Sequence, residues 1–243
     1  MIFSAIVGAI SSAIASIGTI ITSVAAKVGP VIAKVATGIK TVLSKIDIEK
    51  VGQFVNILSN TISTLDSIFK THNEKISDDI LGAASSLVDY SIDDFESTQE
   101  YIDSIKQDIE SGRIDCSRIL TEENKLGYQT IGMSIKMTAL NEKTGLNISP
   151  EVLNTIVKVE QALPKIIGLD ELLKYYFDEC KLEYAEDVSC FLEEKPNGHN
   201  REMYNLTYKF LESNNVENPD RVIFDMMDAC KREYTGGNND SNA

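Results

Sequence analysis

The chain has 243 residues, 43% of them apolar and 7% aromatic, and its net charge is −14. This length and apolar content allow one or two domains with a hydrophobic core. The acidic balance argues against nucleic acid as a main partner, because phosphate binding needs clustered Lys and Arg side chains.

The charges are unevenly distributed along the chain. Residues 1–46 contain four lysines and no acid, whereas residues 47–243 contain 19 cations and 37 acids and therefore carry −18. This asymmetry predicts a cationic, apolar arm over residues 1–46 and an acidic body over residues 47–235. The polar residues 236–243 are expected to form a disordered tail.

Large apolar side chains recur at intervals of three or four residues through the arm, which predicts a helix with one apolar stripe. The stripe consists of Ile2, Ile6, Ile10, Ile14, Ile17, Ile21, Val24, Val28, Ile32, Val35, Ile39 and Val42. Gly29 and Pro30 interrupt it, because Pro lacks an N–H group and crowds the preceding turn. We therefore expect a helical hairpin or a kinked helix with its hinge at Gly29 and Pro30.

The arm has the length and composition of a conditional membrane segment. Its first 26 residues contain no charge, and about 20 apolar residues span a bilayer. Ten strongly apolar side chains favour insertion by roughly 3–6 kcal/mol in total, and seven hydroxyls and two glycines oppose it. We predict that the stripe from Ile2 to Ile39 enters lipid and that Lys27, Lys34, Lys40 and Lys45 contact headgroups.

The opening sequence, MIFSAIVGAISSAI, is similar in composition to the Ala-, Ser-, Gly- and Ile-rich openings of membrane-perforating capsid proteins and of toxins delivered by bacterial injection machines. Two other interpretations remain open. A cleaved signal peptide would normally begin with basic residues, which this segment lacks. The arm could instead be a buried helix of an ordinary α-domain or of an oligomer.

The segment from 47 to 70 has a heptad-like pattern that predicts a pairing helix. Its seam consists of Ile48, Val51, Val55, Leu58, Ile62, Leu65 and Phe69. Three heptads are short for a free coiled coil, so an intramolecular partner is expected. The arm is one candidate partner, and ordinary packing in a bundle is the alternative.

Helix caps follow one another through the acidic body, and no alternating stretch predicts a strand. The expected starts are Ser77, Ser91, Thr121, Ser149-Pro150 and Asn218-Pro219, and the expected ends include Gly112 and Gly145. The fold is therefore predicted to be all-α, a multi-helix bundle with the apolar N-terminal arm or hairpin attached.

Residue patterns for enzyme chemistry are weak. The acid pairs Asp78/Asp79, Asp93/Asp94 and Glu122/Glu123 fall in expected first turns, where carboxylates complement the helix dipole. No metal-ligand spacing, phosphate loop or nucleophile motif is present in the sequence. We therefore predict no catalytic residue, no metal and no cofactor.

Cysteines and aromatic residues are expected to lie in the core. The four cysteines Cys116, Cys180, Cys190 and Cys230 form no CxxC motif and predict buried thiols in a reducing cytoplasm. The densest aromatic patch is Tyr175, Tyr176 and Phe177 with Tyr184 and Phe191. It is interpreted as core, or alternatively as a groove for an amphipathic helix.

Together these patterns predict a non-enzymatic, membrane-active protein whose acidic body keeps the arm soluble. A delivered toxin or effector is one candidate of this kind. The expected partners are a lipid bilayer, or a chaperone that shields the arm, and a homo-oligomer is also compatible. The alternative is a structural or adaptor subunit of a larger assembly, such as a phage particle or a secretion apparatus, with the arm packed against neighbouring subunits.

Overall fold

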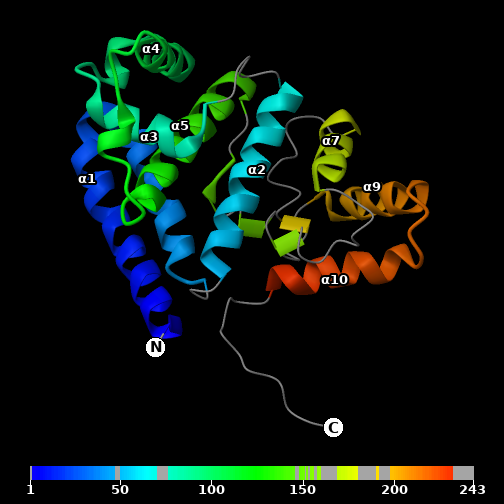
Figure 1. Cartoon of the computed structure of the whole chain (residues 1–243). Coiled ribbons are helices and arrows are strands. Elements are labelled where there is room, and N and C mark those ends of the chain that lie inside the picture. The colour runs from blue at the N-terminus through cyan, green and yellow to red at the C-terminus, as the bar shows by residue number, and fades with distance from the viewer. Residues whose placement is uncertain are drawn as a thin grey trace. The chain divides into compact units, whose positions relative to one another are not determined.

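The computed structural model describes the backbone of residues 2–46, 50–69, 76–145, 148–150, 152, 154–155, 158–159, 169–179, 190–191 and 198–231. Within helices, side chains are described except at residues 2–11, 13, 68–69, 169–170 and 177–179. The described residues form helices and no strand, which confirms the all-α prediction (Figure 1). By their contacts, residues 1–44 and 59–150 form one unit, and residues 45–58 and 151–243 form a second.

The first helix, α1 (Ile2–Leu43), is broken at Gly29, whose φ of 75° and ψ of 167° lie in a region that only glycine occupies readily. Pro30 follows and starts the second half. A Cβ atom placed on Gly18 would lie 2.7 Å from Lys40 Nζ, so residues equally distant from Gly29 on either side are neighbours. The first half (residues 2–28) and the second half (residues 30–43) therefore run side by side as a helical hairpin (Figure 1).

The helix α5 (Lys125–Thr144) is the centre of the first unit. It packs against α1, α3 (Asp78–Leu87) and α4 (Thr98–Glu110), and every residue from 130 to 140 is buried. The buried hydroxyls of Thr130, Ser134 and Thr138 each donate to the carbonyl four residues earlier. Hydroxyls satisfied in this way can lie in an apolar environment at low cost.

Glycines allow α3 and α5 to cross in backbone contact. A Cβ atom on Gly82 would lie 1.9 Å from the Tyr128 carbonyl oxygen, and one on Gly132 would lie 1.9 Å from the Asp78 carbonyl oxygen. Both distances are far below any real contact, so the crossing requires glycine on each helix.

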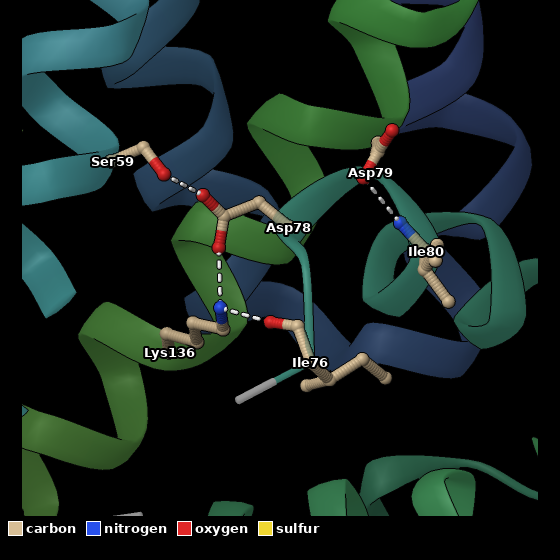
Figure 2. Close-up of polar contacts among 6 residues, drawn as sticks. All are labelled: Ser59, Ile76, Asp78, Asp79, Ile80 and Lys136. Carbon is tan, nitrogen blue, oxygen red and sulfur yellow. Dashed lines mark hydrogen bonds and ion pairs between the residues drawn. The ribbon is translucent and has the colours of Figure 1, made fainter. Parts of the chain in front are cut away.

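A buried ion pair connects the same two helices (Figure 2). Lys136 Nζ lies 2.6 Å from Asp78 Oδ1, and the two residues are 8% and 5% exposed. Lys136 also donates to the Ile76 carbonyl at 2.6 Å, and Ser59, from α2 (Val51–Phe69), donates to the second Asp78 oxygen. Each charge therefore has an opposite charge and a further hydrogen bond.

Two expected helix starts are wrong. Ser91 heads only a short 3-10 turn, η2 (Ile92–Asp94), and α4 starts later, where the Ser97 side chain accepts from the Glu100 N–H. Similarly, α5 starts at Lys125 after a turn over residues 121–124, so Glu122 and Glu123 precede its first turn. Near its end, Gly145 adopts a left-handed φ of 70°, as a C-terminal glycine is expected to.

The second unit contains α7 (Leu169–Glu179), α9 (Asn200–Ser213) and α10 (Pro219–Lys231). Its buried cluster includes Tyr176, Phe191 and Cys230, so these members of the predicted aromatic and cysteine sets lie in a core. The Tyr176 hydroxyl lies 2.7 Å from Thr207 Oγ1, which satisfies both groups. Phe177 has no described side chain, and Tyr184 lies outside the described residues.

Candidate functional site

The apolar stripe of α1 faces the inside of the first unit. Its buried members are Ile17, Ile21, Val24, Val28, Ile32 and Ile39, and Ile14 and Val35 are half-buried. The side chains of Ile2, Ile6 and Ile10 lie outside the described residues. Because α1 packs along α5 and α3, the stripe is part of a protein core over most of its length.

After the break at Gly29, the buried positions follow the predicted stripe only in part. In the second half the completely buried positions are Ile32, Ala36 and Leu43, with Ile39 at 1% exposure, while Val35 and Val42 are half-buried. Ala36 continues the spacing of three and four residues from Ile32 to Ile39, and it lies outside the predicted stripe because that stripe consists of large apolar side chains.

Ile20, which the predicted stripe omits, contacts α5 where that helix has a glycine. A Cβ atom on Gly127 would lie 2.3 Å from Ile20 Cδ1 and 3.3 Å from Ile20 Cβ. Ile20 is adjacent to the stripe member Ile21, and a broader apolar face on the first half would have included it.

Small and hydroxylated residues form the outer face of the first half of the hairpin. The exposed residues of the first half include Ala15, Thr19, Thr22, Ser23 and Ala26. Thr22 Oγ1 donates to the Gly18 carbonyl at 2.9 Å, and Ser23 Oγ donates to the Ile20 carbonyl at 2.8 Å. These hydroxyl protons are already bonded to the helix's own backbone and do not depend on water.

The second half shows the same internal bonding of hydroxyl groups. Thr37 donates to the Ala33 carbonyl at 2.8 Å, and Thr41 donates to the Thr37 carbonyl at 2.9 Å. The outer face of the hairpin is therefore less polar in its bonding than its composition suggests.

The four lysines of the arm have different surroundings. Lys27 Nζ donates to the Ser86 carbonyl at 2.9 Å and to the Val88 carbonyl, at the C-terminal end of α3. Lys40 lies beside Gly18 in the other half of the hairpin, whereas Lys34 and Lys45 are exposed. Lys27 therefore forms hydrogen bonds to a helix outside the hairpin.

Two further contacts join the hairpin to the first unit, one in the middle of the first half and one at the hinge. Ser16 Oγ donates to the Glu123 carbonyl at 3.2 Å, just before α5 begins. At the hinge, a Cβ atom on Gly29 would lie 2.8 Å from Ile92 Cγ2 in η2. Glycine at the hinge thus supplies both the unusual backbone angles and the space for Ile92.

The predicted pairing helix is present as α2. Its seam residues Val51, Val55, Leu58, Ile62 and Leu65 are buried. Phe54 and Ile57, which the seam omitted, are buried as well. Ile48 lies outside the described residues, as does the side chain of Phe69. Pairing between this helix and the arm stays a prediction.

The described part of the chain was also compared with the side-chain groupings that bind metal ions. No group of three or more His, Cys, Asp or Glu residues there is arranged to hold a metal ion. Cys116, Cys190 and Cys230 are free thiols, and Cys180 lies outside the described residues. Burial raises the pKa of the Cys116 thiol, with smaller contributions from Asp115 and Asp79, so this thiol stays protonated at neutral pH.

One segment of the described helices, Ile14–Leu43, is long and apolar enough to cross a membrane by length and composition. A core helix of a soluble protein and an N-terminal signal sequence share these two properties. No protein-family model, no curated protein and no solved structure matches the chain.

Proposed function

We propose that this protein is a membrane-active, non-enzymatic α-helical protein whose N-terminal hairpin leaves the first unit and inserts into a lipid bilayer. One observation carries the proposal. The first half of α1 combines a long uncharged sequence with exposed hydroxyls that bond to the helix's own backbone. A helix of this kind can bury its outer face in hydrocarbon without breaking hydrogen bonds to water.

The dimensions of the first half suit a single crossing. The 25 residues from 2 to 26 rise about 37 Å as an α-helix, and the hydrocarbon core of a bilayer is about 30 Å thick. By composition alone, the seven hydroxyl groups of residues 1–26 oppose insertion. The intrahelical bonds of Thr22 and Ser23 lower the cost of transfer for these two groups, because burying an unbonded hydroxyl costs about 1–3 kcal/mol on protein scales.

The first unit gives the hairpin a second environment that also excludes water. Ile17, Val24 and Val28 are completely buried there. Movement from this core into lipid exchanges one apolar environment for another, so the stripe need not be exposed to water permanently in either state. The net charge of −18 on residues 47–243 favours solubility of the rest of the chain before insertion.

Replacing Ile14 with lysine tests this proposal. Ile14 is half-buried and lies within the uncharged run, where a lysine at the centre of a crossing helix costs about 2.5–3.5 kcal/mol. We expect Ile14→Lys to lower dye release from anionic vesicles about 100-fold at equal protein concentration. Far-UV circular dichroism is expected to show nearly unchanged helix content.

The matched control is Gln107→Lys, which adds the same charge at an exposed position of α4. This variant should release dye as the wild type does. Equal release by both variants would contradict the proposal. Loss of helix content throughout the Ile14→Lys chain would show that the arm serves only as core.

A further inference from the structure

We infer that Lys27 is a clasp that holds the hairpin against α3, and that anionic phospholipid headgroups open it by competing for the ammonium group. The inference rests on the proposed membrane insertion and specifies how that insertion is controlled. It assigns to Lys27 a role in the closed state that the other lysines of the arm do not share.

The geometry of the clasp is specific. Lys27 Nζ donates to two carbonyl groups, those of Ser86 and Val88, at the end where the α3 dipole is negative. The Val88 N–H bonds back to the Ala84 carbonyl, so the α3 terminus is itself ordered. The lysine therefore serves as a charged C-terminal cap supplied by a different helix.

Lys27 lies at the position along α1 where a single side chain can control whether the first half of the hairpin leaves the first unit. It is the first charged side chain of the chain, directly after the 26 uncharged residues, and lies two residues before the hinge at Gly29. The stripe residues on either side of it, Val24 and Val28, are completely buried, and lipid can replace the surroundings of their apolar side chains. The hydrogen bonds of Lys27 are different, since hydrocarbon offers no acceptor for an ammonium group.

A headgroup phosphate can replace the two carbonyls. When residues 2–26 cross the hydrocarbon, Lys27 reaches the interface, where lysine side chains extend toward headgroups. A phosphate carries a full negative charge, whereas the carbonyls at a helix end share about half a charge. In neutral phosphatidylcholine the choline ammonium of the same headgroup balances this charge, whereas an anionic headgroup keeps a net negative charge that attracts lysine. Anionic lipid is therefore expected to open the hairpin more readily than neutral lipid does.

The test uses Lys27→Met in the full chain, which keeps an unbranched side chain but removes the charge and its hydrogen bonds. Without lipid, hydrogen exchange of the amides of α1 should become about tenfold faster, because bonds to a charged group are lost. Exchange in α4 should stay unchanged, which distinguishes local opening from general unfolding. Lys27→Arg, which keeps the charge, should stay close to wild type.

Lys34→Met is the matched control, since Lys34 is an exposed lysine of the same hairpin. It should leave exchange in α1 unchanged. With vesicles, wild-type protein should release dye faster from anionic than from neutral phosphatidylcholine membranes, and Lys27→Met should reduce this difference at least threefold. Inorganic phosphate without vesicles should not accelerate exchange in the wild type, because it offers the stripe no apolar environment.

The outcomes separate the clasp from the membrane proposal. Unchanged α1 exchange in Lys27→Met, or equal acceleration in Lys34→Met, would overturn the clasp even if the wild type releases dye. An equal preference for anionic vesicles in Lys27→Met and wild type would overturn the competition by headgroups. Opening by free phosphate would show that the competing phosphate need not belong to a lipid, and would overturn the assignment to lipid headgroups. Faster exchange in Lys27→Met together with no release by any variant would support the clasp and refute membrane activity.

Discussion

The ion pair between Asp78 and Lys136 shows how a single charged residue depends on the whole first unit. Asp78 lies in the first turn of α3, as expected from its sequence position, and this placement favours a carboxylate. Its partner is 58 residues away on a buried face of α5. Nothing in the local sequence identifies Lys136 as that partner, because the pairing depends on how α3 and α5 cross.

Removing one charge of this pair should be costly. We expect Asp78→Asn and Lys136→Met each to lower the free energy of unfolding by about 3–5 kcal/mol, since each leaves an unpaired buried charge. The double variant should lose less than the sum of the two single variants. Urea unfolding followed by circular dichroism provides the measurement.

An exposed ion pair supplies the control for this series. Arg221 and Asp225 lie one turn apart on α10, with side chains 74% and 55% exposed. Arg221→Met should change stability by less than about 0.5 kcal/mol. Additive losses in the Asp78/Lys136 double variant would show that the two residues do not act as a buried pair.

At the level of helices, the spacing of apolar residues predicts where the helices lie more accurately than it predicts where they begin and end. The stripe of α1, the seam of α2 and the glycine that terminates α5 could all be read from the sequence. The starts of α4 and α5 were misplaced because Ser91 and Thr121 have the side chains of helix caps but begin turns. Ser97 and Asn124, also suitable residues, occupy the actual N-cap positions.

The crossing of α3 and α5 was not predictable from either helix alone. Gly82 and Gly132 look like weak points in a helix, since glycine is a poor helix former. Their value appears only when the two helices meet in backbone contact. Small-residue patterns indicate that close approach is possible, but they do not identify the partner helix.

This crossing leads to a prediction about glycine replacement. Gly82→Ala and Gly132→Ala should each lower the free energy of unfolding by about 1–3 kcal/mol or more, because the new methyl group meets backbone atoms that cannot move separately. Gly52→Ala in α2 should instead raise it by about 0.5 kcal/mol, since that position is helical and open. Thermal or urea unfolding of the three variants decides the point, and stable Gly82→Ala and Gly132→Ala proteins would exclude the close crossing.

At the scale of the molecule, the sequence separates residues 1–46 from the rest by charge, whereas contacts group residues 1–44 with residues 59–150. Composition describes what a segment is made of, and contacts describe what covers it in the closed form. The hairpin has the apolar composition of a membrane segment, and α5 covers it in the structure. The proposed function depends on movement between these two environments.

The most direct test prevents that movement with a reversible bond. Ile20 Cβ lies 3.3 Å from the position of a Cβ on Gly127, slightly below the 3.5–4.5 Å usual between disulfide-bonded residues, so Ile20→Cys with Gly127→Cys can cross-link the first half of the hairpin to α5 after a small adjustment. Each single variant, with and without reductant, controls for the native cysteines and for the loss of the Ile20 side chain.

Dye release from anionic vesicles is measured for the oxidised double variant before and after reduction. The account predicts release at the level of spontaneous leakage while the disulfide is intact, and recovery to the level of the single variants once it is reduced. Equal release by the oxidised and reduced forms would show that the hairpin need not leave α5, and would contradict the account.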